Sequence, residues 1–284
     1  ALIRSESFQR SVEKVLGGQH VISNQEFQGI TCQVAANPVF QEGKVTGAVI
    51  LILDVTEKMK GEQMRREFTA NVSHELKTPL TSISGFAEII NDGFVKPEDT
   101  KKFAGRIFKE AQRLITLVND VIKISQLDEG KLPYEKEEVD LYEAVRETFL
   151  RIEDHAKAEG VHLYLYGPHI KSNTVKTILD EIIYNLCDNG IKYNKKGGSL
   201  TVTISQEGEK PVVTVEDTGI GISEEDQKRI FERFYRVDKS HSKAIGGTGL
   251  GLSIVKHGTM FLGADMKVES TLGEGSKFTL ILPE

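Results

Sequence analysis

A histidine in a segment that favours a helix is the clearest candidate for chemistry in this chain. His74 lies at the centre of FTANVSHELKTPL, residues 68–80. Glu75 follows directly and could accept a hydrogen bond from one ring nitrogen, which would leave the other nitrogen free as a nucleophile. Thr78 lies one helical turn further on, where its hydroxyl could orient a water molecule. Pro79 is expected to kink the helix beside this site. A lone helical histidine is usually structural, but this combination indicates a reactive one.

A second group of polar residues is typical of a nucleotide site. Asn185 and Asn189 are four residues apart on a predicted helix, so both side chains project the same way. Their amide oxygens are hard ligands that suit Mg²⁺. Lys192 and Tyr193 follow one turn later, and they suit phosphate charge and adenine packing respectively. An isolated pair of asparagines is more often solvated helix surface, so this interpretation depends on motifs further along the chain.

Two glycine-rich motifs supply that support. DTGIG covers residues 217–221 and GTGLG covers residues 247–251. Asp217 ends a predicted strand, where its carboxylate can accept a hydrogen bond from the exocyclic amine of adenine. Gly219 and Gly221 would let the base lie close to the backbone. The second motif precedes an apolar helix, and a helix N-terminus binds anions readily. A glycine-rich loop alone could be a plain flexible turn, so Asp217 makes the nucleotide site the stronger interpretation.

The elements that must position these motifs form an α+β sandwich in the second half of the chain, with helices on one face of a mixed sheet. DEGKLPYEKEEVD, residues 128–140, is a polar linker that precedes it. Helices are expected at 141–158, 173–193, 223–233 and 249–262. Strands are expected at 162–166, 199–206, 211–216, 266–270 and 276–282.

Two amphipathic helices precede the sandwich. The first begins near Thr56, NDGFVKP at residues 91–97 interrupts the pattern, and the second has apolar residues on one face from Phe103 to Ile124. An antiparallel hairpin of this kind cannot bury two wide apolar stripes by itself. A dimeric four-helix bundle is therefore expected. The alternative is a monomer in which the stripe packs against the rest of the chain.

The N-terminal segment is predicted to contain one helix and three strands. The helix ends near residue 18, and the strands cover 20–23, 29–36 and 45–53. The last two strands are joined by a turn-rich segment that contains Asn37-Pro38 and Glu42-Gly43. This segment is too small to form a comfortable core by itself.

The order of the motifs resembles that of the sensor histidine kinases of bacterial two-component systems. The segment around His74 resembles their phosphoacceptor box, and the downstream motifs resemble the boxes of their ATP-binding domain. These motifs are NLCDNGIKY (185–193), DTGIG, FERFYR (231–236), GGTGLGL and GEGSKF (273–278). The resemblance covers residues 57–284. It implies the cytoplasmic portion of a kinase of the phosphate- or cell-wall-sensing type, with the Bergerat fold that Hsp90, MutL and type II topoisomerases share.

This resemblance implies a multidomain α+β chain with three parts. Residues 1–55 resemble the C-terminal part of an incomplete PAS sensor domain, through LILDVTE at residues 51–57. Residues 56–130 correspond to the helical hairpin for dimerisation and histidine phosphotransfer. Residues 131–284 correspond to the catalytic ATP-binding domain.

The resemblance also implies a role for individual residues. His74 is the phosphoacceptor, and Glu75 is its base or orienting partner. Thr78 matches the position that the family uses in the phosphatase reaction. Asn189 would bind Mg²⁺ with support from Asn185, Asp217 would recognise adenine, and Lys192 and Arg236 would meet the phosphates. Phe231 and Phe234 would anchor a lid that runs from Arg236 to Gly247. The other residues expected to contact ATP are Tyr193, Gly219, Gly221, Gly247, Thr248, Gly249, Leu250 and Gly251.

The implied reaction is autophosphorylation of His74 by ATP with Mg²⁺, followed by transfer to an aspartate of a separate response regulator. The regulator is expected to bind near Ser82, Phe86 and Ile89, and the kinase is also expected to act as its phosphatase. Asp188 departs from the family pattern, since many relatives have asparagine there; it could support the metal through water or face away. Two alternatives stay open: an ATPase of the Hsp90 or MutL class, and a dimeric scaffold without enzyme activity.

Composition narrows the choice of function. The chain has 284 residues, 39% of them apolar and 27% charged, with a net charge of −6, which argues against non-specific binding of nucleic acid. The longest aliphatic run, residues 47–53, is far shorter than the ~20 residues that span a bilayer. The N-terminus lacks the apolar region of a signal peptide, and membrane segments are expected upstream by resemblance only. Cys32 and Cys187 are isolated, as in a reducing compartment.

Overall fold

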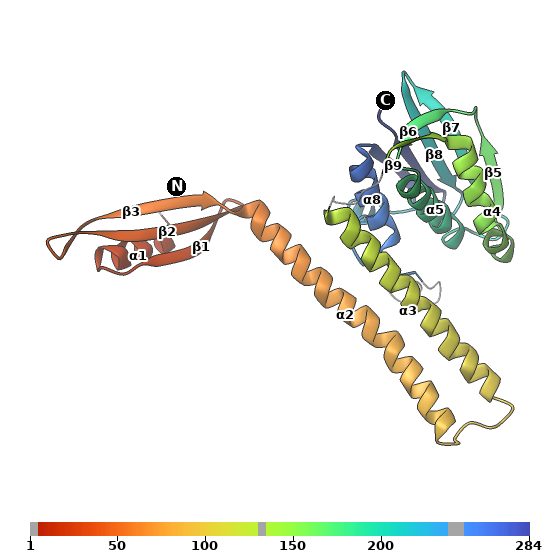
Figure 1. Ribbon diagram of the computed structural model, residues 1–284, viewed down its shortest axis with the longest axis horizontal. Helices are drawn as coiled ribbons and strands as arrows, with labels where there is room; N and C mark the ends of the chain where they lie inside the picture. The colour runs from red at the N-terminus through yellow and green to blue at the C-terminus, as the bar shows by residue number, and fades with distance from the viewer. Residues whose placement is uncertain (1–4, 130–134, 238–246) are drawn as a thin grey trace. The chain divides into compact units, whose positions relative to one another are not determined.

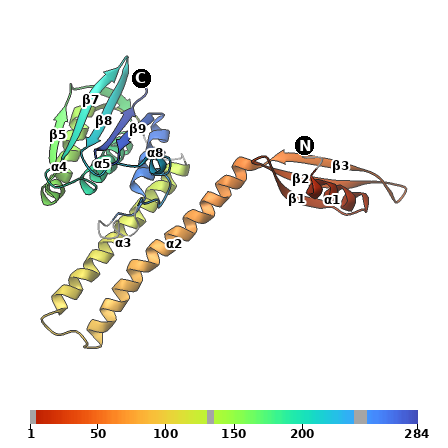
Figure 2. The same cartoon turned by 180° about the vertical axis from the view of Figure 1, so that it is seen from behind.

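The structure, a computed structural model, describes residues 5–129, 135–237 and 247–284 (Figures 1 and 2). The chain divides into two compact units, Ala1–Ser73 and His74–Glu284. Within the described ranges, no helix combines the length and the hydropathy that crossing a membrane requires.

The N-terminal unit is a three-stranded antiparallel sheet with one helix on it. Its elements are α1 (Glu6–Leu16), β1 (Val21–Phe27), β2 (Ile30–Gln41) and β3 (Lys44–Asp54), in the sheet order β1-β2-β3. The hydroxyl of Ser5 caps α1 by accepting a hydrogen bond from the N–H of Phe8. Phe8 and Val15 of α1 are buried, as are Val34 and Ala36 of β2. The predicted helix and three strands are therefore confirmed, and the apolar stripe of α1 covers one face of the sheet.

The turn predicted at Asn37-Pro38 is wrong, because both residues lie inside β2 and pair with β3. β1 pairs with β2 only as far as Ala36, so Pro38 lies on a part of β2 that has a single neighbouring strand. A proline has no N–H for a second neighbour, and a strand tolerates it where that neighbour is absent. The chain turns instead at residues 42–43, where both φ angles are positive.

One helix, α2 (Thr56–Asn91), carries the candidate histidine. It begins where the Asp54 carboxylate accepts a hydrogen bond from the N–H of Thr56 at 2.9 Å. The helix continues through Pro79, beside which the sequence predicted a kink. The hydroxyl of Thr78 donates to the carbonyl of His74 at 3.2 Å, within the same turn.

The part of α2 from His74 onward forms an antiparallel hairpin with α3 (Thr100–Glu129) in the C-terminal unit. Phe86 and Phe103 pack edge to face with ring centroids 5.7 Å apart, and the guanidinium of Arg106 stacks over both rings. Apolar side chains on the hairpin nevertheless stay exposed in the single chain. They are Leu80, Phe108, Ile115, Val118 and Ile122.

The rest of the C-terminal unit is an α/β sandwich, as predicted. Its main sheet has the order β5-β7-β8-β10-β9, with β5 parallel to β7 and the other pairs antiparallel. Helices α4, α5 and α8 cover one face of this sheet (Figures 1 and 2). The elements are β4 (Glu137–Asp140), α4 (Leu141–Glu159), β5 (His162–Tyr166), β6 (Lys171–Thr174), α5 (Lys176–Lys192), β7 (Ser199–Glu207), β8 (Lys210–Asp217), α6 (Glu224–Gln227), α8 (Gly251–Leu262), β9 (Asp265–Thr271) and β10 (Gly275–Ile281).

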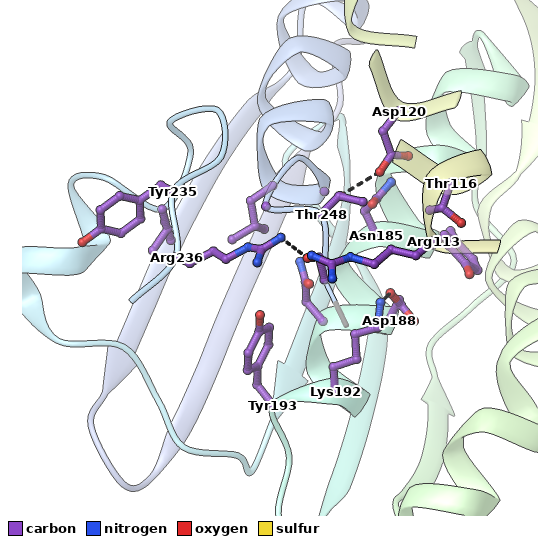
Figure 3. A pocket seen from close by; sticks show the side chains of 17 residues that line it. Arg113, Thr116, Asp120, Asn185, Asp188, Lys192, Tyr193, Tyr235, Arg236 and Thr248 are labelled. Carbon is purple, nitrogen blue, oxygen red and sulfur yellow. Dashed lines mark hydrogen bonds and ion pairs between the residues drawn. The ribbon is translucent and has the colours of Figure 1, made fainter. Parts of the chain in front are cut away.

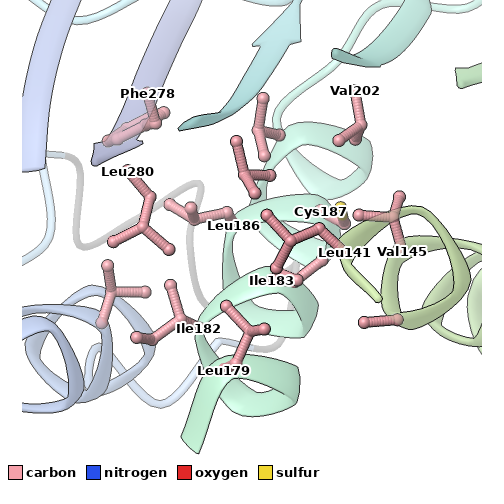
Figure 4. Packing of buried hydrophobic residues seen from close by; sticks show 14 of the residues in the cluster. Leu141, Val145, Leu179, Ile182, Ile183, Leu186, Cys187, Val202, Phe278 and Leu280 are labelled. Carbon is pink, nitrogen blue, oxygen red and sulfur yellow. The ribbon is translucent and has the colours of Figure 1, made fainter. Parts of the chain in front are cut away.

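The core of the sandwich lies between these helices and the sheet, and α5 runs through its centre (Figure 4). Leu179, Ile182 and Ile183 of α5 are fully buried. Cys187 of the same helix is also fully buried, and burial raises the pKa of its thiol well above the ordinary value. The apolar side chains of α5 therefore fix the orientation of the whole helix.

Two predicted helices are shorter than expected. The helix predicted from residue 173 begins at 176, because residues 171–174 form β6 and pair with β4. The helix predicted over 223–233 covers only α6. After α6 the chain turns, Phe234 adopts a positive φ of 63°, and its N–H donates to the carbonyl of Gly249 at 2.9 Å. Before Phe234, the N–H groups of Arg229 and Glu232 donate to carbonyls three residues earlier, as in turns, so the α-helix ends sooner than predicted.

We predict that Leu179→Ala destabilises the sandwich by about 2–5 kcal/mol, because it leaves a cavity in the core beneath α5. Urea denaturation followed by circular dichroism measures the change. Leu150→Ala is the matched control, since Leu150 is 66% exposed on α4 and the same truncation there leaves no cavity. Equal shifts of the unfolding midpoint in the two variants would contradict the assignment of α5 to the core.

Candidate functional site

The end of β8 forms a tight turn around a partly buried carboxylate, that of Asp217. Oδ1 of Asp217 accepts a hydrogen bond from the N–H of Gly219 at 2.8 Å. A Cβ atom on Gly219 would overlap the carbonyl of Tyr193, and one on Gly221, which has a φ of 68°, would overlap the carbonyl of Thr271. Only glycine allows the backbone to approach so closely at these two positions. Burial raises the pKa of Asp217 from 3.8 to about 6.

An apolar cavity of about 210 Å³ lies next to this turn, and Asp217 is one of the residues that line it. A flat heterocycle could lie in this cavity and donate an amine hydrogen to Asp217, which is the arrangement the sequence predicted. The side chains and glycines around the cavity include Asn189, Tyr193, Asp217, Ile220, Gly221, Tyr235, Leu252 and Phe278.

A second cavity, of about 290 Å³, adjoins the first and is polar (Figure 3). The two cavities share six lining residues: Asn189, Tyr193, Ile230, Tyr235, Arg236 and Leu252. α5 presents Asn185, Asn189 and Lys192 to the second cavity, so one helical face carries three of the predicted site residues, and Tyr193, which directly follows the helix, lines the cavity as well. An apolar cavity that continues into a polar one suits a molecule with a flat base and a charged tail.

The amide of Asn185 is oriented by its own helix. Its Nδ2 donates to the carbonyl of Glu181 at 2.8 Å, so the side-chain oxygen is the remaining acceptor. A Cβ atom on Gly251 would lie 2.8 Å from that oxygen. Glycine at this position therefore lets the start of α8 approach the amide.

Asp188, which departs from the family pattern, lines the polar cavity. Its carboxylate pairs with Nζ of Lys192 at 2.5 Å and lies 3.3 Å from Nδ1 of His155. Lys192 therefore has an acidic partner inside the site. A phosphate that binds Lys192 would have to share it with Asp188.

The predicted glycine loop lies at the start of α8. Leu250 is fully buried there, and Gly249 has a positive φ of 74° beside the backbone of Phe234. The Thr248 hydroxyl accepts a hydrogen bond from the N–H of Leu250 and donates to Asp120 of α3 at 2.8 Å. Gly247, Thr248, Gly249 and Gly251 all line the polar cavity. Residues 238–246, most of the predicted lid, lie outside the described residues.

The predicted lid anchors, Phe231 and Phe234, are not among the residues that line the two cavities. Phe231 packs against the core cluster. The guanidinium of Arg236 donates a hydrogen bond to the carbonyl of Gly247 at the edge of the polar cavity (Figure 3). Tyr235, which was not predicted, lines both cavities and donates its hydroxyl to Asp226 at 2.6 Å. The sequence could have indicated Tyr235 as a site residue, because it lies inside the motif FERFYR.

Three more residues of the polar cavity belong to the hairpin and were missed: Arg113, Thr116 and Asp120 of α3. Burial raises the pKa of Asp120 above its ordinary value. Ion pairs fasten α3 to the sandwich, since Lys123 lies 2.7 Å from Glu181 and Asp128 lies 2.7 Å from Arg233. The hairpin therefore supplies part of the cavity wall, which no motif in the sequence indicated.

The surroundings of the candidate histidine differ from the expectation. His74 and Thr78 are exposed, and neither is among the residues that line the two cavities. Glu75 was expected to accept a hydrogen bond from the imidazole, but the described residues contain no such bond. Its carboxylate lies instead 3.6 Å from Arg113 and 3.8 Å from Arg236.

Two family models match the chain. The His Kinase A (phospho-acceptor) domain matches residues 64–130, and the histidine kinase-, DNA gyrase B- and HSP90-like ATPase domain, which binds ATP, matches residues 174–284. The first match contains His74, and the second contains both glycine-rich motifs.

Curated proteins with similar sequences include two bacterial kinases. The chain is 35% identical to sensor histidine kinase WalK of Bacillus subtilis over 252 residues, which are 86% of this chain and 40% of that protein. It is 36% identical to sensor-like histidine kinase SenX3 of Mycolicibacterium smegmatis over 238 residues, which are 84% of this chain and 62% of that protein. The chain thus spans less than two thirds of the length of either relative.

Solved structures of histidine kinases share the fold. Histidine kinase ThkA, in a crystal structure with response regulator protein TrrA, matches with a TM-score of 0.62 and 25% identity over 99% of this chain and 85% of that one. Histidine kinase AdeS of Acinetobacter baumannii matches with a TM-score of 0.60 and 24% identity over 74% of this chain and 96% of that one.

The raised pKa of Asp217 predicts that its ionisation opposes folding. Between its unfolded value near 3.8 and its folded value of about 6, the folded chain holds a proton that the unfolded chain has lost. Stability therefore falls as the pH rises through this window. Asp217→Asn cannot ionise, so its stability relative to the parent chain should increase between about pH 4 and about pH 6 in urea denaturation and level off at higher pH. Asp154→Asn, at an exposed position on α4, is the control. A parent–variant difference that does not change with pH would contradict this assignment.

Proposed function

This chain belongs to the sensor histidine kinases of two-component systems, and we propose that it transfers the γ-phosphoryl group of ATP to His74. The observation that carries the proposal is the ion-pair distance of 3.8 Å between Glu75, the residue next to His74, and Arg236 on the wall of the polar cavity. The histidine segment and the presumed phosphate site therefore share a charged contact within the C-terminal unit.

The residues of the two cavities fit ATP. The apolar cavity would hold adenine, with Asp217 accepting a hydrogen bond from the amine and Tyr193 packing beside the base. The polar cavity would hold the phosphates near Lys192, Arg236 and the N-terminus of α8, where backbone N–H groups favour anions. The close backbone approaches at Gly219 and Gly221 support this assignment, because a larger residue at either position would distort the wall of the site.

The residues present also fit a magnesium ion. Asn189, supported by Asn185, would supply amide oxygens, and ATP would supply phosphate oxygens. Bound Mg²⁺ would neutralise phosphate charge and so assist the transfer. Asp188 lines the same cavity and adds an acidic group that many relatives lack there.

The proposed chemistry needs a neutral imidazole on His74. One ring nitrogen forms a bond to the γ-phosphorus while the bond from that phosphorus to the β,γ-bridging oxygen breaks, and ADP leaves with the electron pair. The ring then loses the proton on its other nitrogen, for which Glu75 is the nearest predicted acceptor. Arg236 would offset the charge that develops on the transferred group.

We propose that a separate response regulator then accepts the phosphoryl group on an aspartate. The ThkA structure, solved with response regulator protein TrrA, supports this partner. The expected docking surface near Ser82, Phe86 and Ile89 is at least partly accessible on the hairpin. A second copy of the chain would cover the exposed apolar residues of the hairpin and complete a four-helix bundle.

The ranges 1–55, 56–130 and 131–284 are our proposed domains, with a PAS-like segment, a hairpin and an ATP-binding domain. The phosphate- or cell-wall-sensing type and membrane attachment outside this chain stay predictions of the resemblance. Thr78 supports a second activity, hydrolysis of the regulator's phosphate, because its side chain is exposed one turn after His74 and could orient a water molecule.

We predict that the chain, incubated with γ-labelled ATP and Mg²⁺, acquires label that is labile in acid and stable in base, as expected of a phosphohistidine. His74→Ala should abolish the label, because the nucleophile is lost. His162→Ala, at an exposed histidine on β5, should keep it. Label that survives in His74→Ala would identify a different acceptor. ATP turnover without any label would favour the Hsp90 or MutL class, and ATP binding without label or turnover would favour a scaffold.

We predict that Thr78→Ala slows dephosphorylation of a phosphorylated response regulator by about tenfold or more, because the hydroxyl that would orient the attacking water is lost. Labelling of His74 should change by less than about twofold, because Thr78 has no part in the attack. Thr81→Ala is the matched control, since the Thr81 hydroxyl donates to the carbonyl four residues earlier, as that of Thr78 does. Equal loss of both activities in Thr78→Ala would show that the residue is structural.

A further inference from the structure

The carboxylate of Glu75 lies between two guanidinium groups from different parts of the C-terminal unit. Nη2 of Arg113, on α3, is 3.6 Å from Oε2 of Glu75, and Nη2 of Arg236, beyond α6, is 3.8 Å from the same oxygen. The two arginine side chains are 22% and 10% exposed, so both are largely removed from water. At these distances the contacts are ion pairs without close hydrogen bonds, and a better acceptor could replace the carboxylate.

Both arginines also line the polar cavity, together with Lys192, Asn189 and the glycine loop (Figure 3). The positively charged side chains of this cavity have different acidic partners. Lys192 has Asp188 at 2.5 Å. Within the described residues, Glu75 is the acidic partner of Arg113 and of Arg236. The two guanidinium groups therefore depend on one carboxylate that does not itself line the cavity.

A terminal phosphate is a stronger partner for this pair than Glu75. It carries more negative charge than a carboxylate, and its oxygens match the planar fork of a guanidinium. We propose that Arg113 is a phosphate-binding residue supplied by the hairpin, and that Arg113 and Arg236 exchange Glu75 for the γ-phosphate when ATP binds. This inference rests on the proposed function, because it assigns the terminal phosphate of ATP to the polar cavity.

The exchange has a chemical consequence for His74. While Glu75 pairs with the two arginines, its carboxylate is held toward their guanidinium groups, and within the described residues it makes no hydrogen bond to the imidazole of His74. When the γ-phosphate binds the two arginines in place of Glu75, the carboxylate of Glu75 is released beside His74. As the nitrogen–phosphorus bond forms and ADP departs, the freed carboxylate accepts the proton that the ring loses. Glu75 thus becomes available as a base only when the terminal phosphate is in place.

The test compares the affinity of the 284-residue chain for ADP with its affinity for a non-hydrolysable ATP analogue, by isothermal titration calorimetry. Arg113→Gln should weaken binding of the analogue by about tenfold and change binding of ADP by less than about twofold, since one charge-assisted contact to the terminal phosphate is lost. Arg113→Lys should recover part of the loss, because it restores the charge without the planar fork. Arg106→Gln is the matched control on the same helix, where Arg106 stacks over Phe86 and Phe103.

Glu75→Gln tests the exchange directly. Without the competing carboxylate, the analogue should bind about three- to tenfold more tightly while ADP binding stays unchanged. Weaker or unchanged binding of the analogue to this variant would overturn the exchange. Equal weakening of ADP and analogue by Arg113→Gln would assign Arg113 a structural role, and no weakening at all would remove it from the phosphate site.

These affinities separate the inference from the proposed function. If the parent chain fails to label His74 but Arg113→Gln still loses affinity for the analogue alone, the phosphate-binding role holds and the kinase proposal fails. If the parent chain labels His74 and Arg113→Gln binds the analogue normally, the kinase proposal holds and this inference fails. Retained binding of ADP shows in either case that the variant has folded around the site.

Discussion

The packing of α5 between the sheet, α4 and α8 is the constraint on which the site depends. One face of this helix is buried among apolar side chains, and a neighbouring face presents Asn185, Asn189 and Lys192 to the polar cavity. The close packing of the buried face fixes the orientation of α5 about its own axis. The directions of its polar side chains are therefore fixed as well. The core therefore orients the presumed ligands of ATP, and loops complete the enclosure around them.

A second dependence joins the hairpin to the sandwich. α3 carries apolar residues that pack within the hairpin and charged residues that contact the sandwich. Among the charged residues, Lys123 pairs with Glu181 and Asp128 pairs with Arg233. It also supplies Arg113, Thr116 and Asp120 to the polar cavity. The wall of the polar cavity is thus shared between the hairpin, whose other helix carries His74, and the sandwich, which is expected to bind ATP.

Much of the fold could be predicted from the sequence where the periodicity was strong. β5 matches its predicted range, because its alternating exposure follows the alternation of its residues. β6 and α6 were misjudged, since each has only four residues and depends on partners far along the chain. The motifs indicated Asn189 and Asp217 because they are local. Arg113 gave no such signal, because an arginine on an amphipathic helix is ordinary until the fold brings it beside Arg236.

The burial of Cys187 has a consequence for measuring motion in this protein. A thiol reacts with alkylating reagents as its thiolate, and burial both shields this sulfur and keeps it protonated. Cys32, in the N-terminal unit, is partly accessible. The rate at which Cys187 is alkylated in the native chain therefore reports how often α5 separates from its neighbours. The same chain provides Cys32 as an internal reference for the reagent, so the opening of the core can be followed without an introduced label.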